Sequence, residues 1–255
     1  MTMYSNSRLD QFDNCRYRYD LQYNKKVKTP FETIEAFMGK MVHETLEKLY
    51  RDLWDDNTDT EAELLDFYSK DWDEKYHDEM IYNRDMSELD YKDMGMDCII
   101  AYYERNQPFD GYTVAGIETD ELLDLPDGNT YSIRIDRLDF KGKVFRVCDY
   151  KTSGSMKTQY AADTDRQLAR YALWVHRKYD PVRVKLVWHM LRFDKDVESD
   201  RNMFELQDQE RKVVDKIAEI EHCDSWPTNP GRLCDWCTYR HLCPEFRDEY
   251  PDPNE

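Results

Sequence analysis

The sequence has no run of about 18 consecutive apolar residues, so we expect no transmembrane helix. Its first residues lack the basic-then-apolar pattern of a secretory signal, and we therefore expect a cytoplasmic protein with no membrane partner. A phosphate-binding GxxxxGK(S/T) motif is also absent, which argues against a built-in helicase motor. The formal net charge of -18 argues against a protein that coats nucleic acid non-specifically. A local basic groove is still compatible with that charge.

Cysteine is present, but in an odd number, seven, which does not suit a disulfide framework in a cytoplasmic protein. Cys234 and Cys237 form a CxxC, and Cys243 follows after five intervening residues. Three closely spaced thiolates indicate a site for zinc or for iron–sulfur. The fourth ligand is either Cys15, near the other end of the chain, or His241.

Residues 131–151 read as two strands joined by a turn at Lys141-Gly142-Lys143. Asp149 and Lys151 end an apolar run two residues apart, so both side chains lie on one face of a strand. Together with Asp136 they form a charge cluster that is expensive to bury unless it is compensated. A divalent cation held by Asp136 and Asp149 would compensate it.

The remaining pattern predicts helices over residues 5–23 and 33–54, and an acidic helical block over residues 55–106 beside the sheet. A strand at 112–125 and the paired strands at 131–151 follow, then a polar loop at 152–164. A helix at 165–179, a strand at 182–193 and a helix at 207–221 complete the order. A helical crossover between strands implies an α/β fold with a mixed sheet, and 255 residues suit one large domain.

Several polar residues on these helices have ordinary interpretations when taken alone. His43 is a polar residue on the second helix, one turn after Gly39, where a glycine permits another backbone or a ligand to approach closely. Gln167 and Tyr171 lie one turn apart on the helix at 165–179. A parallel pair, Arg166 and Arg170, reads as a solvated helix face.

Taken together, six ordered segments resemble the RecB-like branch of the PD-(D/E)XK nucleases. The resemblance is strongest to iron–sulfur members such as the CRISPR-associated adaptation exonuclease and the nuclease domain of AddB-type helicase–nucleases. The segments are SNSRLDQFDNCRYRYDLQY, GKMVHETLEKLY, IRIDRLDF, VCDYKTSG, QLARYALW and the cysteine tail. The resemblance implies a restriction-endonuclease-like core, with a helical insertion at residues 55–110 and a cysteine-rich segment at 223–247.

The resemblance also implies the roles of individual residues. His43, Asp136, Asp149 and the Tyr150 carbonyl would bind Mg²⁺ or Mn²⁺, and Lys151 would be the catalytic lysine. Gln167 and Tyr171 would support the site and contact nucleic acid. A 4Fe–4S cluster would be held by Cys15, Cys234, Cys237 and Cys243, with Zn²⁺ as the alternative. Candidates for holding the phosphate backbone are Arg134, Arg137, Lys157, Arg166 and Arg170.

Two departures from the family pattern stand out. Many relatives have glycine where this chain has Ile133, and the CRISPR-associated ones often have Glu-x-Lys where this chain has Asp149. The leading hypothesis is a metal-dependent DNA exonuclease that prefers single strands, acting alone or with a helicase, recombination or replication partner. The alternatives are an endonuclease or flap nuclease with the same site, or a non-catalytic nucleic-acid-binding or adaptor protein with a zinc-stapled fold.

Overall fold

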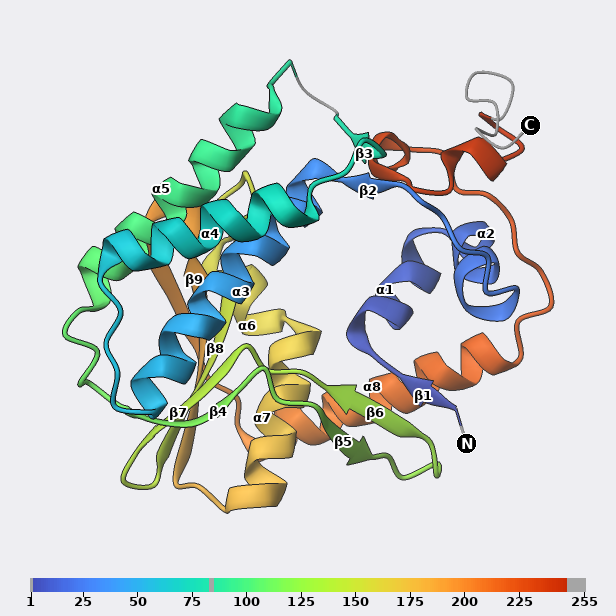
Figure 1. Cartoon of the computed structure of the whole chain (residues 1–255). Helices are drawn as coiled ribbons and strands as arrows, with labels where there is room; N and C mark the ends of the chain where they lie inside the picture. The colour runs from blue at the N-terminus through green and yellow to red at the C-terminus, as the bar shows by residue number, and fades with distance from the viewer. Residues whose placement is uncertain (1, 83–84, 247–255) are drawn as a thin grey trace.

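The computed structural model describes residues 2–82 and 85–246 of the chain (Figure 1). Residue 247, the last of the expected cysteine-rich segment, lies outside the described residues. Within them, no helix is both long and apolar enough to cross a membrane.

The helices are α1 (Asn6–Asn14), α2 (Arg16–Tyr19), α3 (Ile34–Trp54), α4 (Glu61–Lys75), α5 (Glu88–Asn106), α6 (Gln159–Thr164), α7 (Arg166–Tyr179) and α8 (Met203–Glu221). Shorter helical turns are η1 (Asp20–Asn24), η2 (Leu191–Phe193), η3 (Arg232–Trp236) and η4 (Arg240–Leu242). The strands are β1 (Met3–Tyr4), β2 (Glu32–Thr33), β3 (Met80–Ile81), β4 (Thr113–Ile117), β5 (Glu121–Asp124), β6 (Thr130–Ile133), β7 (Arg137–Lys141), β8 (Val144–Lys151), β9 (Arg183–Met190) and β10 (Lys195–Ser199).

A five-stranded mixed sheet forms the centre, in the order β10-β9-β8-β7-β4. Strands β8 and β9 are parallel, because α7 carries the chain back between them, and the other neighbours are antiparallel. Side chains alternate between the two faces, so Val147 packs with residues of α7 and α8 while Tyr150 packs with residues of α3 and α5. The prediction of an α/β fold with a mixed sheet flanked by helices is confirmed.

A second sheet of three strands, β1-β6-β5, was not expected. The sequence pattern joined residues 112–125 into one strand and residues 131–151 into one hairpin. In the structure each of these stretches changes sheet part-way along. β4 and β7 pair in the central sheet, while β5 and β6 pair in the smaller one. Backbone hydrogen bonds from Glu118 to Asp136 and from Thr119 to Ile135 hold the two crossings together.

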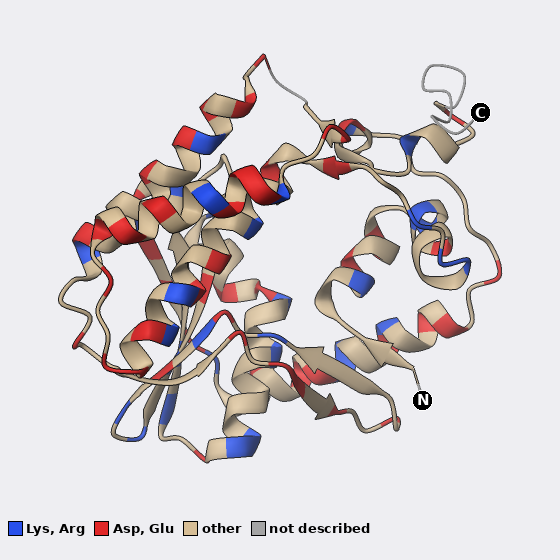
Figure 2. Cartoon of the chain, in the orientation of Figure 1, with Lys and Arg blue, Asp and Glu red and all other residues tan. Residues whose placement is uncertain are grey.

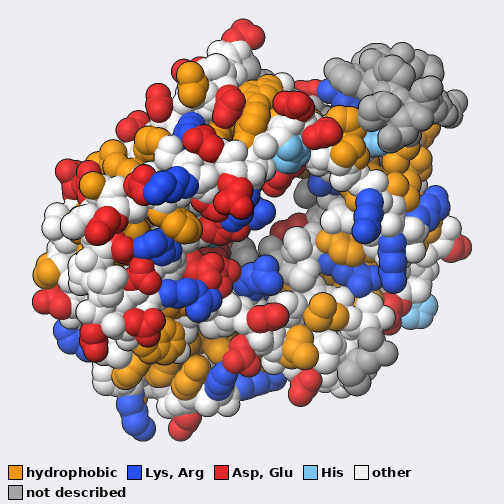
Figure 3. All heavy atoms as spheres, viewed as in Figure 1, with side chains coloured by type: hydrophobic (Ala, Val, Ile, Leu, Met, Phe, Trp, Pro, Cys, Tyr) orange, Lys and Arg blue, Asp and Glu red, His pale blue; other side chains and the backbone are white. Residues whose placement is uncertain are grey.

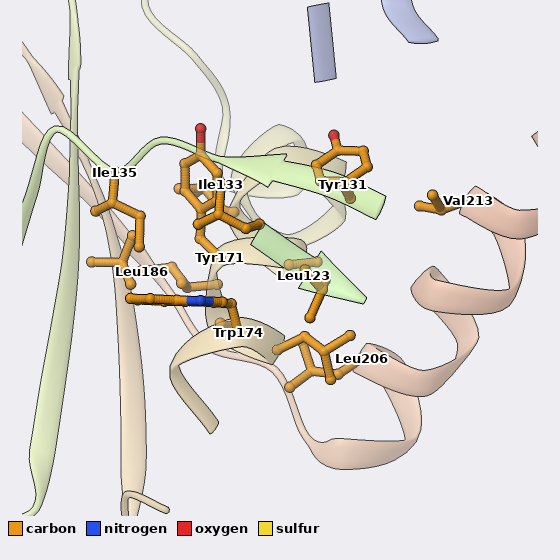
Figure 4. Packing of buried hydrophobic residues seen from close by; sticks show 14 of the residues in the cluster. Leu123, Tyr131, Ile133, Ile135, Tyr171, Trp174, Leu186, Leu206 and Val213 are labelled. Carbon is orange, nitrogen blue, oxygen red and sulfur yellow. The ribbon is translucent and has the colours of Figure 1, made fainter. Parts of the chain in front are cut away.

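The smaller sheet packs its apolar side chains against α7 and α8. Figure 4 shows Ile133 and Leu123 facing Tyr171, Trp174 and Leu206, with Ile135 beside Leu186 just beyond the end of β6. Ile133 is completely buried in this cluster. The isoleucine is therefore accommodated by core packing.

Two other local predictions were wrong, and one strand was missed. The helix expected at 5–23 breaks at Cys15, whose extended backbone (φ -160°, ψ 111°) ends α1 and begins α2. The loop expected at 152–164 contains α6, which begins with Thr158 as its N-cap. Strand β10 at the sheet edge was not predicted.

Helices α4 and α5, which lie in the expected insertion at 55–110, pack on α3 around Phe37 and Trp72, whose ring centroids are 4.8 Å apart. Both helices begin with capping boxes, at Thr60 and Ser87. Their apolar sides complete a second core cluster on the α3 face of the sheet. Acidic residues recur along both helices (Figure 2), and many of them are exposed.

Candidate active site

Helix α3 brings His43 to the end of β8. The His43 Nε2 atom lies 3.0 Å from the Tyr150 carbonyl oxygen, and its Nδ1 atom lies 3.5 Å from Asp136 Oδ2. Asp136 Oδ2 also accepts a hydrogen bond from the Tyr150 backbone N–H at 2.7 Å. Three of the predicted ligand groups therefore lie together, although they come from a helix, a sheet crossing and a strand.

Gly39 allows α3 to come this close to the strand end. A Cβ atom at this position would lie 2.9 Å from the Thr152 hydroxyl, just after Lys151. The expectation that Gly39 permits a close approach is confirmed.

Asp149 and Lys151 share one face of β8, as the alternation predicted. The Lys151 Nζ atom lies 2.5 Å from Asp149 Oδ2. Burial raises the pKa of Asp149 despite the neighbouring Lys151 ammonium, which lowers it, and the charge of Asp136 adds to the rise. Burial disfavours the Lys151 ammonium, but the carboxylates of Asp149, Asp136 and Asp165 together outweigh burial and raise the lysine pKa. Within the described residues Asp149 Oδ2 makes no hydrogen bond beyond this ion pair, so the carboxylate is suited to a cation.

Glu118 is a functional candidate that the sequence analysis missed. Three residues, His43, Glu118 and Asp136, each place one possible ligand atom within 4.8 Å of the other two. They form a candidate metal site. Burial raises the pKa of Glu118 to about 7, and the nearby Asp136 charge adds to the effect. Glu118 also has a positive φ of 43°, because it stands at the crossing between β4 and β5. An acidic residue ending the apolar run of β4 was the one signal that could have identified it.

A cavity of about 710 Å³ opens onto these ligands. Figure 3 shows this face of the molecule hollowed beside α3, with acidic and basic side chains around it. Arg134 is exposed and lines the cavity, so its predicted contact with phosphate remains a prediction that suits its place. The other charged lining residues are Glu35, Lys40, His43, Glu44, Glu47, Glu118 and Asp136.

Gln167 and Tyr171 lie beside this centre on α7. The Gln167 side-chain amide donates a hydrogen bond to the Tyr171 hydroxyl at 2.7 Å. Tyr171 is buried, and the charge of Asp149 adds to burial in raising its pKa. Their predicted contact with nucleic acid stays a prediction, while their packing fits a supporting role.

The predicted phosphate contact of Arg137 does not fit the structure. Only 2% of the residue is exposed, and its guanidinium donates to both Asp139 carboxylate oxygens, at 2.9 and 3.0 Å. It also donates to the Tyr150 hydroxyl at 2.7 Å. Arg137 therefore holds the strand ends together from inside the molecule.

Arg170 is likewise buried, and its Nη1 atom donates to Asn6 Oδ1 at 2.7 Å and to the Tyr131 hydroxyl at 2.9 Å. It is not accessible to a phosphate, and the interpretation as a solvated helix face is wrong for it. Arg166 is partly exposed but forms ion pairs with Asp10 and Asp13 at 2.5 and 2.9 Å. These two arginines join α7 to the N-terminal helix α1. Their polar contacts are therefore made within the protein.

The four cysteines of the predicted cluster line one cavity of about 160 Å³. All are free thiols. Burial raises the pKa values of Cys237 and Cys243, and the neighbouring Cys15 and Cys234 add to both shifts. The two ends of the chain meet here, because the Tyr17 N–H donates to the Pro227 carbonyl at 3.0 Å. His241, the other candidate fourth ligand, does not line this cavity.

Comparison with known proteins identifies a family whose model matches this chain. Residues 3–244 match the family described as the PD-(D/E)XK nuclease superfamily. The sequence matches no curated protein. Among solved structures, the crystal structure of SSO0001 is similar at 18% identity with a TM-score of 0.37, covering 62% of this chain and 79% of that one.

Proposed function

Because the chain belongs to the PD-(D/E)XK nuclease superfamily, we propose that it is an exonuclease that hydrolyses phosphodiester bonds in single-stranded DNA. Membership of the superfamily implies a metal-dependent nuclease that acts on DNA. The observation that carries the proposal is the convergence of His43, Asp136 and the Tyr150 carbonyl beside the Asp149–Lys151 pair.

The donor set fits Mg²⁺ or Mn²⁺. Asp136, Asp149 and the Tyr150 carbonyl offer hard oxygen ligands, and the nitrogen of His43 favours Mn²⁺. Glu118 adds a further carboxylate on the His43 side. A bound divalent cation would supply a water of lowered pKa and polarise the scissile phosphate.

Lys151 supplies a positive charge next to Asp149 at the end of β8. Because Asp149 raises its pKa, the lysine stays protonated at neutral pH. From the end of β8 its ammonium would orient the attacking water and offset the negative charge that builds up on the phosphate. Gln167 and Tyr171 keep this side of the site in place through their hydrogen bond.

Two features support a single-stranded substrate. The cavity over the ligands has a volume of about 710 Å³, in the range of small-molecule pockets, so it suits individual nucleotides of a single strand. The exposed acidic residues of α4 and α5 would repel a phosphate backbone from those helices, so DNA would reach the ligands through the cavity. A separate helicase or recombination partner would supply the unwound strand.

For the cysteine cavity we propose a structural 4Fe–4S cluster, with Zn²⁺ as the alternative. Cys15, Cys234, Cys237 and Cys243 all line the same cavity, which suits either group held by four thiolates. Anaerobically purified protein should contain iron and sulfide and absorb near roughly 400 nm. Colourless protein with stoichiometric zinc would contradict the cluster.

A cleavage assay tests the nuclease. End-labelled single- and double-stranded DNA is incubated anaerobically with Mg²⁺ or Mn²⁺ and with wild type, Asp149→Ala or Lys151→Ala. Lys185→Ala serves as a matched control, because Lys185 lies on the neighbouring strand in an exposed ion pair with Glu198. We expect the wild type and the control to degrade single strands and the two site variants to lose the activity.

The same assay separates the alternatives. Cutting of closed-circular DNA would indicate an endonuclease, and preferential cutting of a branched substrate would indicate a flap nuclease. Binding without any cleavage by the wild type would indicate a non-catalytic nucleic-acid-binding or adaptor protein. If Lys151→Ala cuts as fast as the wild type, the assignment of the site is wrong.

A further inference from the structure

A second cavity, of about 400 Å³, lies on the Asp149 side of the site between α1, α6 and the start of α7. It shares no lining residue with the 710 Å³ cavity. Its walls include Asp165 and Trp188. Trp188 stands opposite Asp149 in the parallel pair of strands, and the Asp165 carboxylate interacts electrostatically with Asp149 and Lys151. The second cavity is therefore next to the catalytic pair.

Tyr160 on α6 is the most unusual residue of its wall. The residue is 76% exposed, a value that only Val182 equals among the large hydrophobic residues that the structure describes. Among the described residues, no aromatic ring contacts it and its hydroxyl has no hydrogen-bond partner. Burial in the core does not explain this ring, because water covers most of its surface.

Lys157 supplies a positive charge at the same cavity. It is exposed and forms no ion pair with any residue that the structure describes. Arg166, the other cation of the wall, is already paired with Asp10 and Asp13. Lys157 is thus the cation of this wall whose charge is uncompensated.

An exposed aromatic ring beside an uncompensated lysine matches the two parts of a nucleotide, a flat base and a charged phosphate. We propose that Tyr160 and Lys157 form a nucleotide subsite for the nucleotide next to the scissile phosphate. The base stacks on Tyr160, and its phosphate pairs with Lys157. The subsite rests on the proposed function, since the strand must pass the Asp149–Lys151 pair to reach it. Stacking on one ring is tolerant of base identity, so the subsite does not read sequence.

Binding of a short, fluorescently labelled single-stranded oligonucleotide in Ca²⁺ tests the subsite, with wild type, Tyr160→Ala, Tyr160→Phe and Lys157→Ala compared. Trp54→Ala is the matched control, because Trp54 is another exposed aromatic residue (55%) and lies at the far end of α3, roughly 16 Å along the helix from His43. Loss of one stacking contact should weaken binding by about 5- to 100-fold for Tyr160→Ala. Tyr160→Phe and Trp54→Ala should bind as the wild type does, and Lys157→Ala should weaken binding less at high salt than at low salt.

An oligonucleotide with one abasic position, moved along the strand, identifies the stacked base. The wild type should lose affinity at one position near the cleavage point, and Tyr160→Ala should lose none there. If wild type cuts DNA but Tyr160→Ala binds every oligonucleotide as tightly as the wild type does, the subsite is overturned and the nuclease proposal stands. If wild type neither binds nor cuts single strands, the nuclease proposal fails and the subsite fails with it.

Discussion

Replacing Arg137 with methionine should destabilise the protein strongly, although the residue was first expected to contact DNA. Arg137 lies on β7 with 2% of its surface exposed, and its partner Asp139 is 3% exposed. The guanidinium also stacks 3.8 Å over the ring of Tyr50 and donates to the hydroxyl of Tyr150. Methionine fills similar space but leaves the Asp139 carboxylate buried and unpaired.

Breaking a buried ion pair from one side costs about 3–5 kcal/mol. For a chain of this length each kcal/mol lowers Tm by about 2–4 °C, so we expect a drop of about 6–20 °C. Urea denaturation in the presence of a chelator measures the change without a contribution from metal binding. The double variant Arg137→Met with Asp139→Asn should recover a large part of the loss, because no buried charge is left unpaired.

Lys185→Met is the control for losing a cation from the same sheet, since exposed ion pairs contribute at most about 1 kcal/mol. A loss below about 1 kcal/mol in Arg137→Met, or a double variant no more stable than the single one, would refute this account. If Arg137 instead bound phosphate, Arg137→Met would lose affinity for single-stranded DNA while its urea midpoint stayed unchanged.

Three further predictions concern the surroundings of the site. Gly39→Ala should slow cleavage by roughly tenfold, because its Cβ meets the Thr152 hydroxyl, and adding Thr152→Ala should restore most of the rate in the same assay. Glu118→Gln should weaken Mn²⁺ binding about tenfold, which removes about 1.4 kcal/mol of the metal-induced stabilisation measured by thermal unfolding at saturating wild-type Mn²⁺. Burial lowers the pKa of His189 from 6.5 to about 4, so stability should fall as pH drops from about 6.5 toward about 4, where the unfolded chain binds a proton that the folded chain excludes. His189→Asn should flatten this dependence in urea titrations, and an unchanged slope would contradict the assignment.

Much of the candidate site follows from local pattern. Asp149 and Lys151 lie on one face because strand side chains alternate with period two, whatever else the chain does. His43 is on a helix whose apolar spacing is unambiguous, and the structure has that helix at Ile34–Trp54 with Thr33 as its cap. Family resemblance, rather than periodicity, connected these residues to one another.

The position of a charge, by contrast, could not be inferred from its residue type. Arg134, Arg137 and Arg170 look alike in the sequence, yet the first is exposed at the cavity and the other two are buried. Arg137 is buried because partners from α3, α5, β7 and β8 surround it, and partners that distant cannot be read from neighbouring residues. The sequence alone therefore overestimated the surface that could hold phosphate.

The sequence by itself determined the α/β class, the Asp-x-Lys strand end and the grouping of the three C-terminal cysteines, because each depends on spacing within a short segment. Only the tertiary structure decided that Glu118 joins His43 and Asp136. The chain passes from one sheet to the other between β4 and β5 and again between β6 and β7, and backbone hydrogen bonds between these two crossings bring the two acids together. A change of sheet leaves the alternation of side chains nearly intact, so periodicity cannot reveal it.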